Sequence, residues 1–291
     1  MRIAELYKTK KPVFSIELFP PKTPQGVENL RKKLAEIRTF RPDFISVTYG
    51  AGGGTRHTTR EITRYIKGEL GIEAMPHLTC VSHSRREIVE ALTDLGEAGI
   101  ENIMALRGDP PQGEESFLAP EDGFAHAIEL VRELRGMGGF GIAVAGYPEG
   151  HVEAESYEQS LAYEVEKIKA GADAVVSQFF LDNKVFFSWR DDLRSRGVVC
   201  PVVAGILPAV SADQITRFAG MCGAVVPEAL LEKLRALDDQ PEAAVRAGLD
   251  HALAQIDGLL ADGVDGIHLY ALNRLEPIRE VATRLGRSPA A

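Results

Sequence analysis

The decisive stretch of this sequence is Val13-Phe14-Ser15-Ile16-Glu17-Leu18-Phe19, an apolar run of strand length that contains one carboxyl group. Seven further runs of similar length follow it along the chain. They are FISVTY from Phe44, AMPHLTC from Ala74, NIMALR from Asn102, GIAVAGY from Gly141, AVVSQFF from Ala174, PVVAGIL from Pro201 and GIHLY from Gly266. Because continuous apolar runs are typical of parallel strands buried on both faces, the sequence predicts eight such strands.

Segments with a helical spacing of apolar residues lie between these runs. Val27, Leu30, Leu34 and Ile37 form the first such face. Eight alternating βα units can close into a barrel whose interior is filled by side chains. We therefore predict a single (β/α)8 TIM barrel domain over residues 1–291, with two extra helices between strands seven and eight, one after Pro227 and one from Glu242. A doubly wound open sheet is the alternative architecture.

Composition narrows the class of protein. The 33 basic and 42 acidic side chains are interspersed and give a net charge of −9, which opposes nonspecific binding to nucleic acid or an anionic membrane. The three cysteines are far apart, no histidine pair has metal-ligand spacing, and the charged segment before Val13 is not a signal sequence. We expect a cytoplasmic protein with no disulfide framework, no metal site and no membrane or nucleic-acid partner.

Polar residues follow seven of the eight predicted strands, and the seventh strand alone ends in an apolar run, from Gly205 to Pro208. In strand order the polar residues are Glu17; Thr48 and Tyr49; His77; Arg107 and Asp109; Tyr147; Gln178; and Tyr270, Asn273 and Arg274. Barrel enzymes place their chemistry at the C-terminal ends of the strands. The distribution predicts an active site at that end of the barrel.

Glu17 is the leading candidate for a catalytic group. Strand alternation places Ser15 and Glu17 on the face opposite Phe14 and Ile16, toward the barrel axis. A carboxyl there is poorly solvated, and burial favours the protonated form that a general acid needs. The competing interpretation is a Glu paired with a Lys or Arg at the rim.

Two further segments carry weaker signals. Gly108 allows a sharp exit from the fourth strand, which places Arg107 and Asp109 at the barrel mouth, either as functional groups or as an ion pair with each other. The glycine-rich loop from Tyr49 to Thr55 does not match the spacing of a dinucleotide-binding turn. The turn from Tyr147 to His151 is either a cofactor-binding edge or an ordinary loop.

Eight motifs, in order along nearly the whole chain, carry a resemblance to a known family. They are ELFPPK from Glu17, SVTYGAGG from Ser46, PHLTC from Pro76, ALRGDPP from Ala105, YPEGHVEA from Tyr147, SQFF from Ser177, GILP from Gly205 and HLYALNR from His268. The chain resembles the bacterial methylenetetrahydrofolate reductases. That resemblance implies a barrel that holds FAD and reduces 5,10-methylenetetrahydrofolate to 5-methyltetrahydrofolate with NAD(P)H in a ping-pong cycle. It also implies a role in methionine synthesis and a homo-oligomer, either a dimer or a tetramer.

The resemblance assigns roles to individual residues. Glu17 matches the general acid that opens the methylene bridge of the folate, and Asp109 matches an acid that contacts the pterin and tunes the flavin. Both also contact the substrate in the matched pattern. The positions that match FAD contacts are Thr48, Tyr49, Ala51, His77, Leu106, Arg107, Gly108, Asp109, Tyr147, His151, Ala154 and Lys167. The positions that match contacts to folate or the nicotinamide nucleotide are Gln178, Phe218 and Arg274.

The chain departs from the family pattern on its fifth predicted helix, where Ser160, Tyr163, Val165 and Glu166 stand in place of an Asp and a Lys-rich stretch. This leaves the contacts to the AMP end of FAD open. The match is also loose between Asp109 and Phe124, so that Leu118 and Ala119 are only provisional flavin neighbours. Ala204 stands where the family has a Pro before GILP.

Two other classes of function compete with the reductase. A cofactor-free barrel lyase or aldolase would use a Schiff-base lysine, and no lysine follows a predicted strand. A non-catalytic folate- or flavin-binding subunit would keep the fold but would not need both Glu17 and Asp109. A visible absorption spectrum distinguishes a flavoprotein from the first of these alternatives.

Overall fold

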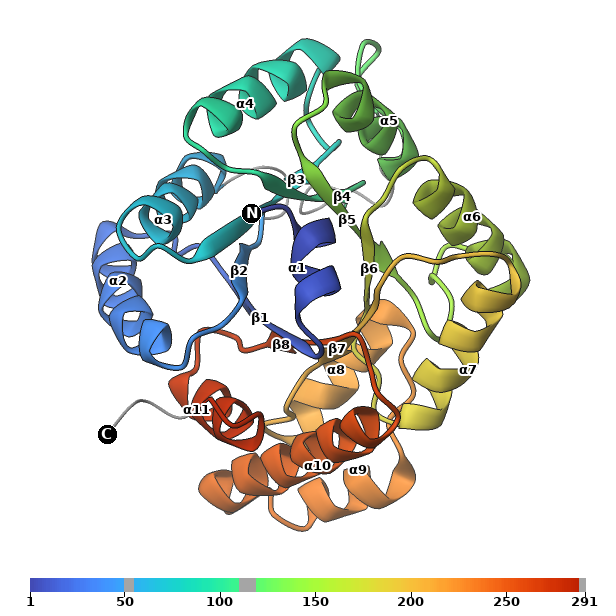
Figure 1. Cartoon of the computed structure of the whole chain (residues 1–291). Coiled ribbons are helices and arrows are strands. Elements are labelled where there is room, and N and C mark those ends of the chain that lie inside the picture. Colours follow the sequence, from blue (N-terminus) through green and yellow to red (C-terminus); the bar gives the residue numbers. More distant parts are fainter. Residues whose placement is uncertain (50–54, 110–118, 288–291) are drawn as a thin grey trace.

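The computed structural model describes residues 1–49, 55–109 and 119–287. Within these ranges, eight strands pair in parallel in sequence order, and β8 pairs back to β1 to close a barrel (Figure 1). The strands are β1 Val13–Leu18, β2 Phe44–Val47, β3 Glu73–Thr79, β4 Asn102–Leu106, β5 Gly141–Gly146, β6 Ala174–Ser177, β7 Val202–Ile206 and β8 Gly266–Tyr270. Each lies in one of the apolar runs. The predicted TIM barrel is confirmed, and the open sheet is wrong.

Helices surround the barrel as a ring (Figure 1). In chain order, the helices of the described ranges are α1 Ile3–Thr9, which lies across one end of the barrel, and then α2 Pro24–Thr39, α3 Arg56–Gly68, α4 Arg85–Glu97, α5 Ala127–Met137, α6 Tyr157–Lys169, α7 Asn183–Ser195, α8 Ala212–Cys222, α9 Glu228–Arg235, α10 Pro241–Ala261 and α11 Leu275–Arg284. Three helices follow β7. Because α10 packs on β7, α7 and α11, it takes the ring position. The two extra helices that the sequence predicts between strands seven and eight, after Pro227 and from Glu242, are α9 and α10.

The alternation of side chains along the strands produces two separate apolar cores. In β1, Phe14 and Ile16 pack outward against the helices, in the same cluster as Leu34 of α2. Val13 points inward and joins Phe44 and the other residues that fill the lower barrel. Ser15 and Glu17 therefore face the barrel interior, as the period-two pattern predicts.

Helix α1 closes the N-terminal end of the barrel, where it lies across the middle of the ring in Figure 1. Ile3 and Leu6 are buried in the same cluster as Val13 and Phe44. Burial of an aliphatic side chain of this size contributes about 1.5–3 kcal/mol. Buried Asn102 on β4 fixes the helix, because its Oδ1 accepts from the Ile3 N–H at 2.8 Å and its Nδ2 donates to the Met1 carbonyl at 3.0 Å.

The seam between β1 and β8 is secured at the opposite end of the barrel. The Asn273 Oδ1 accepts from the Phe19 N–H at 2.9 Å, and its Nδ2 donates to the Phe19 carbonyl at 2.9 Å. Lys33 of α2 donates to the Asn273 carbonyl at 2.8 Å. Asn273 has a φ of +57°, a conformation that Asn adopts more readily than most residues. These bonds hold the loop that follows Glu17 to the loop that follows β8.

Among the described residues, no helix combines the length and the apolar character needed to cross a membrane.

Candidate active site

Glu17 lies at the C-terminal end of β1 inside the barrel, with only 7% of its surface exposed. Its Oε2 is 3.3 Å from the Nε2 of His77 on β3 and 3.6 Å from the Nε2 of His268 on β8. Within the described ranges, these two histidines, and no Lys or Arg, lie within 4 Å of the carboxylate oxygens. The structure therefore favours the buried carboxyl over a rim ion pair.

His77 is held in its neutral form and offers an unused polar atom. Burial lowers the pKa of its imidazole, and this effect outweighs the nearby Glu17 carboxyl, which raises it. Its Nε2 makes no hydrogen bond to the described residues, and neither does Thr48 Oγ1 or Thr79 Oγ1. Unsatisfied buried polar atoms are uncommon and cost about 1–3 kcal/mol each. Three of them lie on β3 or directly after β2, toward the C-terminal ends of the strands, and suit the polar edge of a bound ligand.

His268 is completely buried directly below the Glu17 carboxyl. Its Nδ1 lies 2.7 Å from Ser15 Oγ, and its Nε2 lies 3.4 Å from Ser46 Oγ. The two hydroxyls fix the plane of the ring from both sides. The Glu17 carboxyl thus has an imidazole neighbour with a defined orientation, which suits it to hold and pass a proton.

Tyr49 belongs to a second polar cluster at the ends of β2 and β3. Its hydroxyl accepts from Arg56 Nε at 2.9 Å and lies 2.9 Å from His83 Nε2. Burial raises the pKa of Tyr49, so that the phenol stays protonated. Arg56 also contacts His83. The predicted cofactor residue Tyr49 is therefore held by two side chains that the sequence analysis did not single out.

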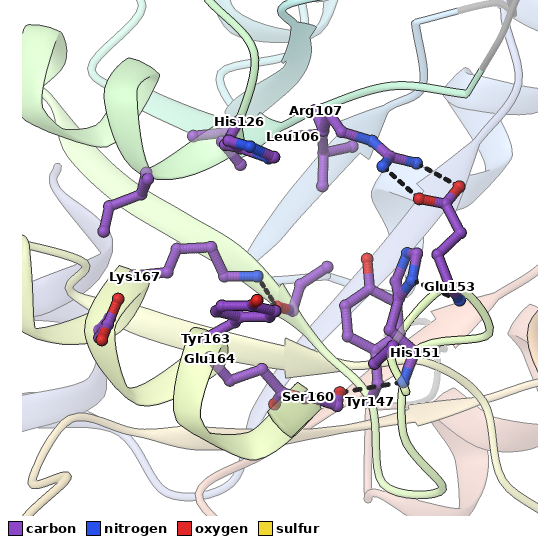
Figure 2. Close-up of a pocket in the computed structure, with 16 residues that line it drawn as sticks. Leu106, Arg107, His126, Tyr147, His151, Glu153, Ser160, Tyr163, Glu164 and Lys167 are labelled. Atoms are coloured by element: carbon purple, nitrogen blue, oxygen red, sulfur yellow. Dashed lines mark hydrogen bonds and ion pairs between the residues drawn. The ribbon is translucent and has the colours of Figure 1, made fainter. Parts of the chain in front are cut away.

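A cavity of about 430 Å³ opens between β4, β5, α5 and α6. Figure 2 shows the side chains that surround it. Among its lining residues are six predicted FAD contacts: Leu106, Arg107, Tyr147, His151, Ala154 and Lys167. The turn that begins at Tyr147 thus lines a cavity and is not an ordinary surface loop.

Arg107 is oriented by Glu153, which lies beside it at the same edge of the cavity (Figure 2). Its Nη1 and Nη2 donate to the two carboxylate oxygens at 2.5 and 2.7 Å, a bidentate pair. This hydrogen bonding raises the pKa of Arg107 and lowers the pKa of Glu153. Arg107 forms this salt bridge with Glu153. The sequence analysis had considered an ion pair between Arg107 and Asp109, whose side chain is exposed.

Gly108 has a φ of +91°, as the sharp exit from β4 requires. A Cβ at this position would lie 2.8 Å from Val81 Cγ1 and 2.9 Å from Thr79 Cβ. The predicted role of this glycine in turning the chain is confirmed.

Lys167 brings a cationic group to the floor of the cavity. Its Nζ donates to the Ala145 carbonyl at 2.6 Å and lies 5.6 Å from the centroid of the Tyr147 ring. Burial lowers the pKa of the ammonium, and the nearby Glu164 carboxyl opposes that shift. The Tyr147 ring meets the His151 ring edge to face at 4.6 Å. An amine, a guanidinium and two aromatic rings around one cavity suit an aromatic ligand that carries negative charge.

The sequence profile of the methylenetetrahydrofolate reductases matches residues 2–286. This chain belongs to that family. It is 38% identical over 277 residues to a 5,10-methylenetetrahydrofolate reductase from Pectobacterium carotovorum subsp. carotovorum, a match that covers 94% of this chain and 90% of the relative. The corresponding Escherichia coli K12 enzyme is 36% identical over 275 residues, covering 94% and 91%.

A plant relative is similar over a shorter share of its length. Methylenetetrahydrofolate reductase (NADH) 1 of Arabidopsis thaliana is 40% identical over 283 residues, which are 94% of this chain and 48% of the relative. The chain spans about half the length of the plant relatives it matches. Among solved structures, an uncharacterised Clostridium thermocellum protein that binds two copies of 5-methyl-5,6,7,8-tetrahydrofolic acid has a TM-score of 0.62 and 13% identity, with 97% and 98% coverage. That likeness concerns the fold alone.

In this member of the methylenetetrahydrofolate reductase family, the predicted substrate residues lie apart from the cavity, on the β6 to β8 side of the ring. Gln178 follows β6, and its Oε1 accepts from the Phe179 N–H at 2.9 Å. Phe218 lies on α8 and packs in an apolar cluster that includes Tyr270. Arg274 precedes α11, 3.8 Å from Glu276. The structure thus spreads these three residues around one half of the mouth.

The β7 side of the mouth is kept close-packed by a glycine. A Cβ on Gly205 would lie 2.2 Å from the Ser177 carbonyl oxygen and 2.6 Å from Tyr270 Cε2. The Tyr270 hydroxyl donates to that same carbonyl at 2.7 Å, and Ser177 Oγ accepts from the Gly205 N–H at 2.9 Å. The apolar seventh strand end therefore lets Tyr270 lie across β6 and β7.

Three predicted or provisional FAD contacts lie outside the described ranges or at the edge of one. Ala51 and Leu118 lie outside the described residues, and Ala119 is exposed at the edge of a described range. In the part of the chain that the structure describes, no three His, Cys, Asp or Glu side chains are grouped to hold a metal ion.

Several residues of the candidate site were missed by the sequence analysis. His268 and Glu153 were quoted only inside motifs, and Glu164 was not mentioned. Strand alternation offered a signal for His268, because it shares the inward face of β8 with Tyr270. For Glu153 and Glu164 the sequence holds no comparable signal, since their roles depend on how a loop and a helix pack.

Proposed function

We propose that this chain is an FAD-dependent enzyme that reduces 5,10-methylenetetrahydrofolate to 5-methyltetrahydrofolate with NAD(P)H. Family membership supports the reaction class. The observation that carries the proposal is the cavity at the barrel mouth, which six predicted cofactor contacts line at the same end of the barrel as the buried Glu17. The printed name of the Arabidopsis relative includes NADH, so NADH is the first donor to test.

The residues present fit FAD. Arg107 and Lys167 bring positive charge to the cavity, as a diphosphate requires, and the Tyr147 and His151 rings provide flat apolar surface. Thr48 Oγ1, His77 Nε2 and Thr79 Oγ1 remain available for hydrogen bonds to the polar edge of a flavin. The chemistry that FAD supplies when bound is acceptance of hydride from the nucleotide and its release to the folate.

We assign Glu17 the role of transferring one proton. Its carboxyl is shielded from water, and it lies beside the neutral imidazole of His77. The acid protonates the folate nitrogen N10, which leaves as the methylene bridge opens and the N5-iminium forms. That cation is the acceptor for hydride. His268, fixed by Ser15 and Ser46, stands 3.6 Å away as a route for the replacement proton.

Asp109 stands at the mouth beyond Gly108, where its exposed carboxyl is free of the barrel core. We assign it contact with the pterin and influence on the flavin potential. Gln178, Phe218 and Arg274 then hold the folate, with Gln178 and Phe218 shared by the nucleotide. Because both substrates use one face of one site, the kinetics are expected to be ping-pong.

The physiological setting follows from the reaction. The product carries a methyl group suited to methionine synthesis, and we place the enzyme in the cytoplasm as a homo-oligomer, a dimer or a tetramer. Size-exclusion chromatography with light scattering tests the assembly, and a monomer would refute it.

The test of the function starts with the purified protein. We expect a yellow protein, or one that becomes yellow on addition of FAD, which NADH or NADPH bleaches and methylenetetrahydrofolate recolours. Comparison of the two nucleotides by stopped flow identifies the donor. A protein that neither contains nor takes up FAD would refute the proposal.

A further inference from the structure

Glu164 is a buried carboxyl at a junction of three elements behind the cavity. It lies on α6 with 2% of its surface exposed. Its Oε2 accepts from the indole N–H of Trp189 on α7 at 3.0 Å, and its Oε1 accepts from Ser160 Oγ at 3.2 Å. A carboxyl is seldom buried without such partners. A carboxyl that only kept the protein soluble would lie at the surface, so the burial of Glu164 indicates another role.

The same carboxyl is connected to the cavity wall (Figure 2). The backbone N–H of Tyr147, at the end of β5, donates to Glu164. One turn earlier on α6, Ser160 Oγ accepts from the His151 N–H at 2.9 Å. Tyr147 is thus held directly, and His151 is held through one hydroxyl. Both side chains are predicted FAD contacts, and their rings meet at 4.6 Å.

Packing fixes the third partner in place. Trp189 is fully buried, and a Cβ on Gly146 would lie 2.3 Å from its Cζ2. The indole therefore lies directly against the end of β5, so that its N–H cannot turn toward another acceptor without displacing the strand. Three donors, from β5, α6 and α7, converge on one carboxyl group.

We propose that Glu164 is a positioning residue for FAD binding, acting through the Tyr147 and His151 backbone to hold that wall of the cavity in its binding geometry. The inference rests on the proposed FAD site. An apolar residue of similar size would leave three donors unsatisfied in the interior, and the turn from Tyr147 to His151 would lose its fixed point. Glu164 itself need not touch the cofactor.

The protonation state of the Glu164 carboxyl can be followed by experiment. Burial raises the pKa of its carboxyl to about 7, although Lys167 on the same helix and the hydrogen bonds from Trp189 and Tyr147 oppose that shift. Burial raises the pKa of Tyr147, directly after β5, and of Tyr157 at the start of α6, and the Glu164 charge adds to both shifts. The Tyr157 hydroxyl donates to Asp192 on α7. Trp189 is the one tryptophan of the chain, so its emission reports on its hydrogen bond to this carboxyl.

The first measurement needs no cofactor. We expect Trp189 emission of the FAD-free protein to change with a midpoint at about pH 7. The change should be absent in Glu164→Gln, which keeps the shape but does not titrate. The matched control is Glu158→Gln, on the same helix with an exposed carboxyl paired to Arg196, and it should retain the transition. A transition that persists in Glu164→Gln would contradict the assignment of the carboxyl.

The second measurement is FAD affinity at fixed pH. We expect Kd to rise about tenfold in Glu164→Gln, the effect of losing about one hydrogen bond to a charged group, and further in Glu164→Leu. Glu158→Gln should match the wild type. Lower thermal stability with an unchanged Kd would mean a merely structural role and would refute the proposal. If Glu164→Leu does not fold, Glu164→Gln still decides the result.

These outcomes separate the two levels of inference. A wild-type protein that does not bind FAD would refute the proposed function, whatever the emission of Trp189 does. A wild-type protein that binds FAD, with the same Kd in both Glu164 variants, would refute the positioning role and leave the proposed function intact.

Discussion

Replacement of Glu17 by Gln separates the two half-reactions of the proposed cycle. Gln has nearly the same shape, so it fits a position that is only 7% exposed between His77 and His268. Its amide cannot release a proton as an acid does. Because flavin reduction by NAD(P)H needs no acid from the protein, that step should stay close to the wild-type rate, whereas folate reduction should slow strongly.

The size of the effect follows from the burial of Glu17. General acid catalysis typically contributes about 10²–10⁴-fold, which corresponds to about 3–5 kcal/mol of activation free energy. A site with so little exposure gives water poor access to replace the missing donor. We therefore expect a loss near the upper end of this range in the folate half-reaction.

Stopped-flow absorbance of the flavin measures the half-reactions one at a time. Anaerobic mixing with NADH follows reduction, and mixing the reduced enzyme with methylenetetrahydrofolate follows reoxidation. Glu90→Gln, an exposed Glu of α4 paired with Arg86, is the matched control and should change neither rate. Equal losses in the two half-reactions of Glu17→Gln would refute the role of Glu17 as a general acid for the folate.

Three further changes test other parts of the structure. Asp109→Asn should weaken folate binding and shift the flavin potential, and an unchanged potential in a spectroelectrochemical titration would count against the tuning role. Gly205→Ala should lower the free energy of unfolding by about 1–3 kcal/mol, seen in urea melts, because its Cβ would overlap the Ser177 carbonyl and the Tyr270 ring. Burial alone would raise the pKa of Asp43, but hydrogen bonds from Arg287, Lys10 and the Phe14 N–H hold it below its ordinary value. Its stabilising contribution is therefore complete above the ordinary pKa of an Asp and is lost as the pH falls through the lowered pKa. Tm should thus decline less steeply in acid for Asp43→Asn than for the wild type; equal slopes would contradict this.

The fold could be predicted from sequence because it depends on local periodicity. Every strand lies in an apolar run of the expected length, and the long spacing between β7 and β8 predicted α9 and α10. The order of the strands then followed from the closure of eight parallel units. The position of α1 under the barrel could not be predicted in this way, since it depends on Asn102, which lies about a hundred residues away in the chain.

The site could be predicted only in part. Strand alternation placed Glu17 inside the barrel, and the strand-end rule found His77 and Tyr147. Neither rule indicates which groups pair with one another. The Arg107 salt bridge to Glu153 and the junction at Glu164 depend on how the β5–α6 loop folds back, which no short-range pattern encodes.

The seam between β1 and β8 determines when the surroundings of Glu17 can form during synthesis and folding of the chain. The Asn273 bonds to Phe19 join residues 254 positions apart, and Glu17 meets His268 across the same seam. Contacts this remote form late, because the entropy of closing so large a loop must be overcome first. Glu17 and its first imidazole neighbour, His77, are synthesised long before His268, so the second imidazole reaches the carboxyl only after β8 has been made. The polar surroundings of Glu17 are thus completed when β8 pairs with β1 and the ring closes.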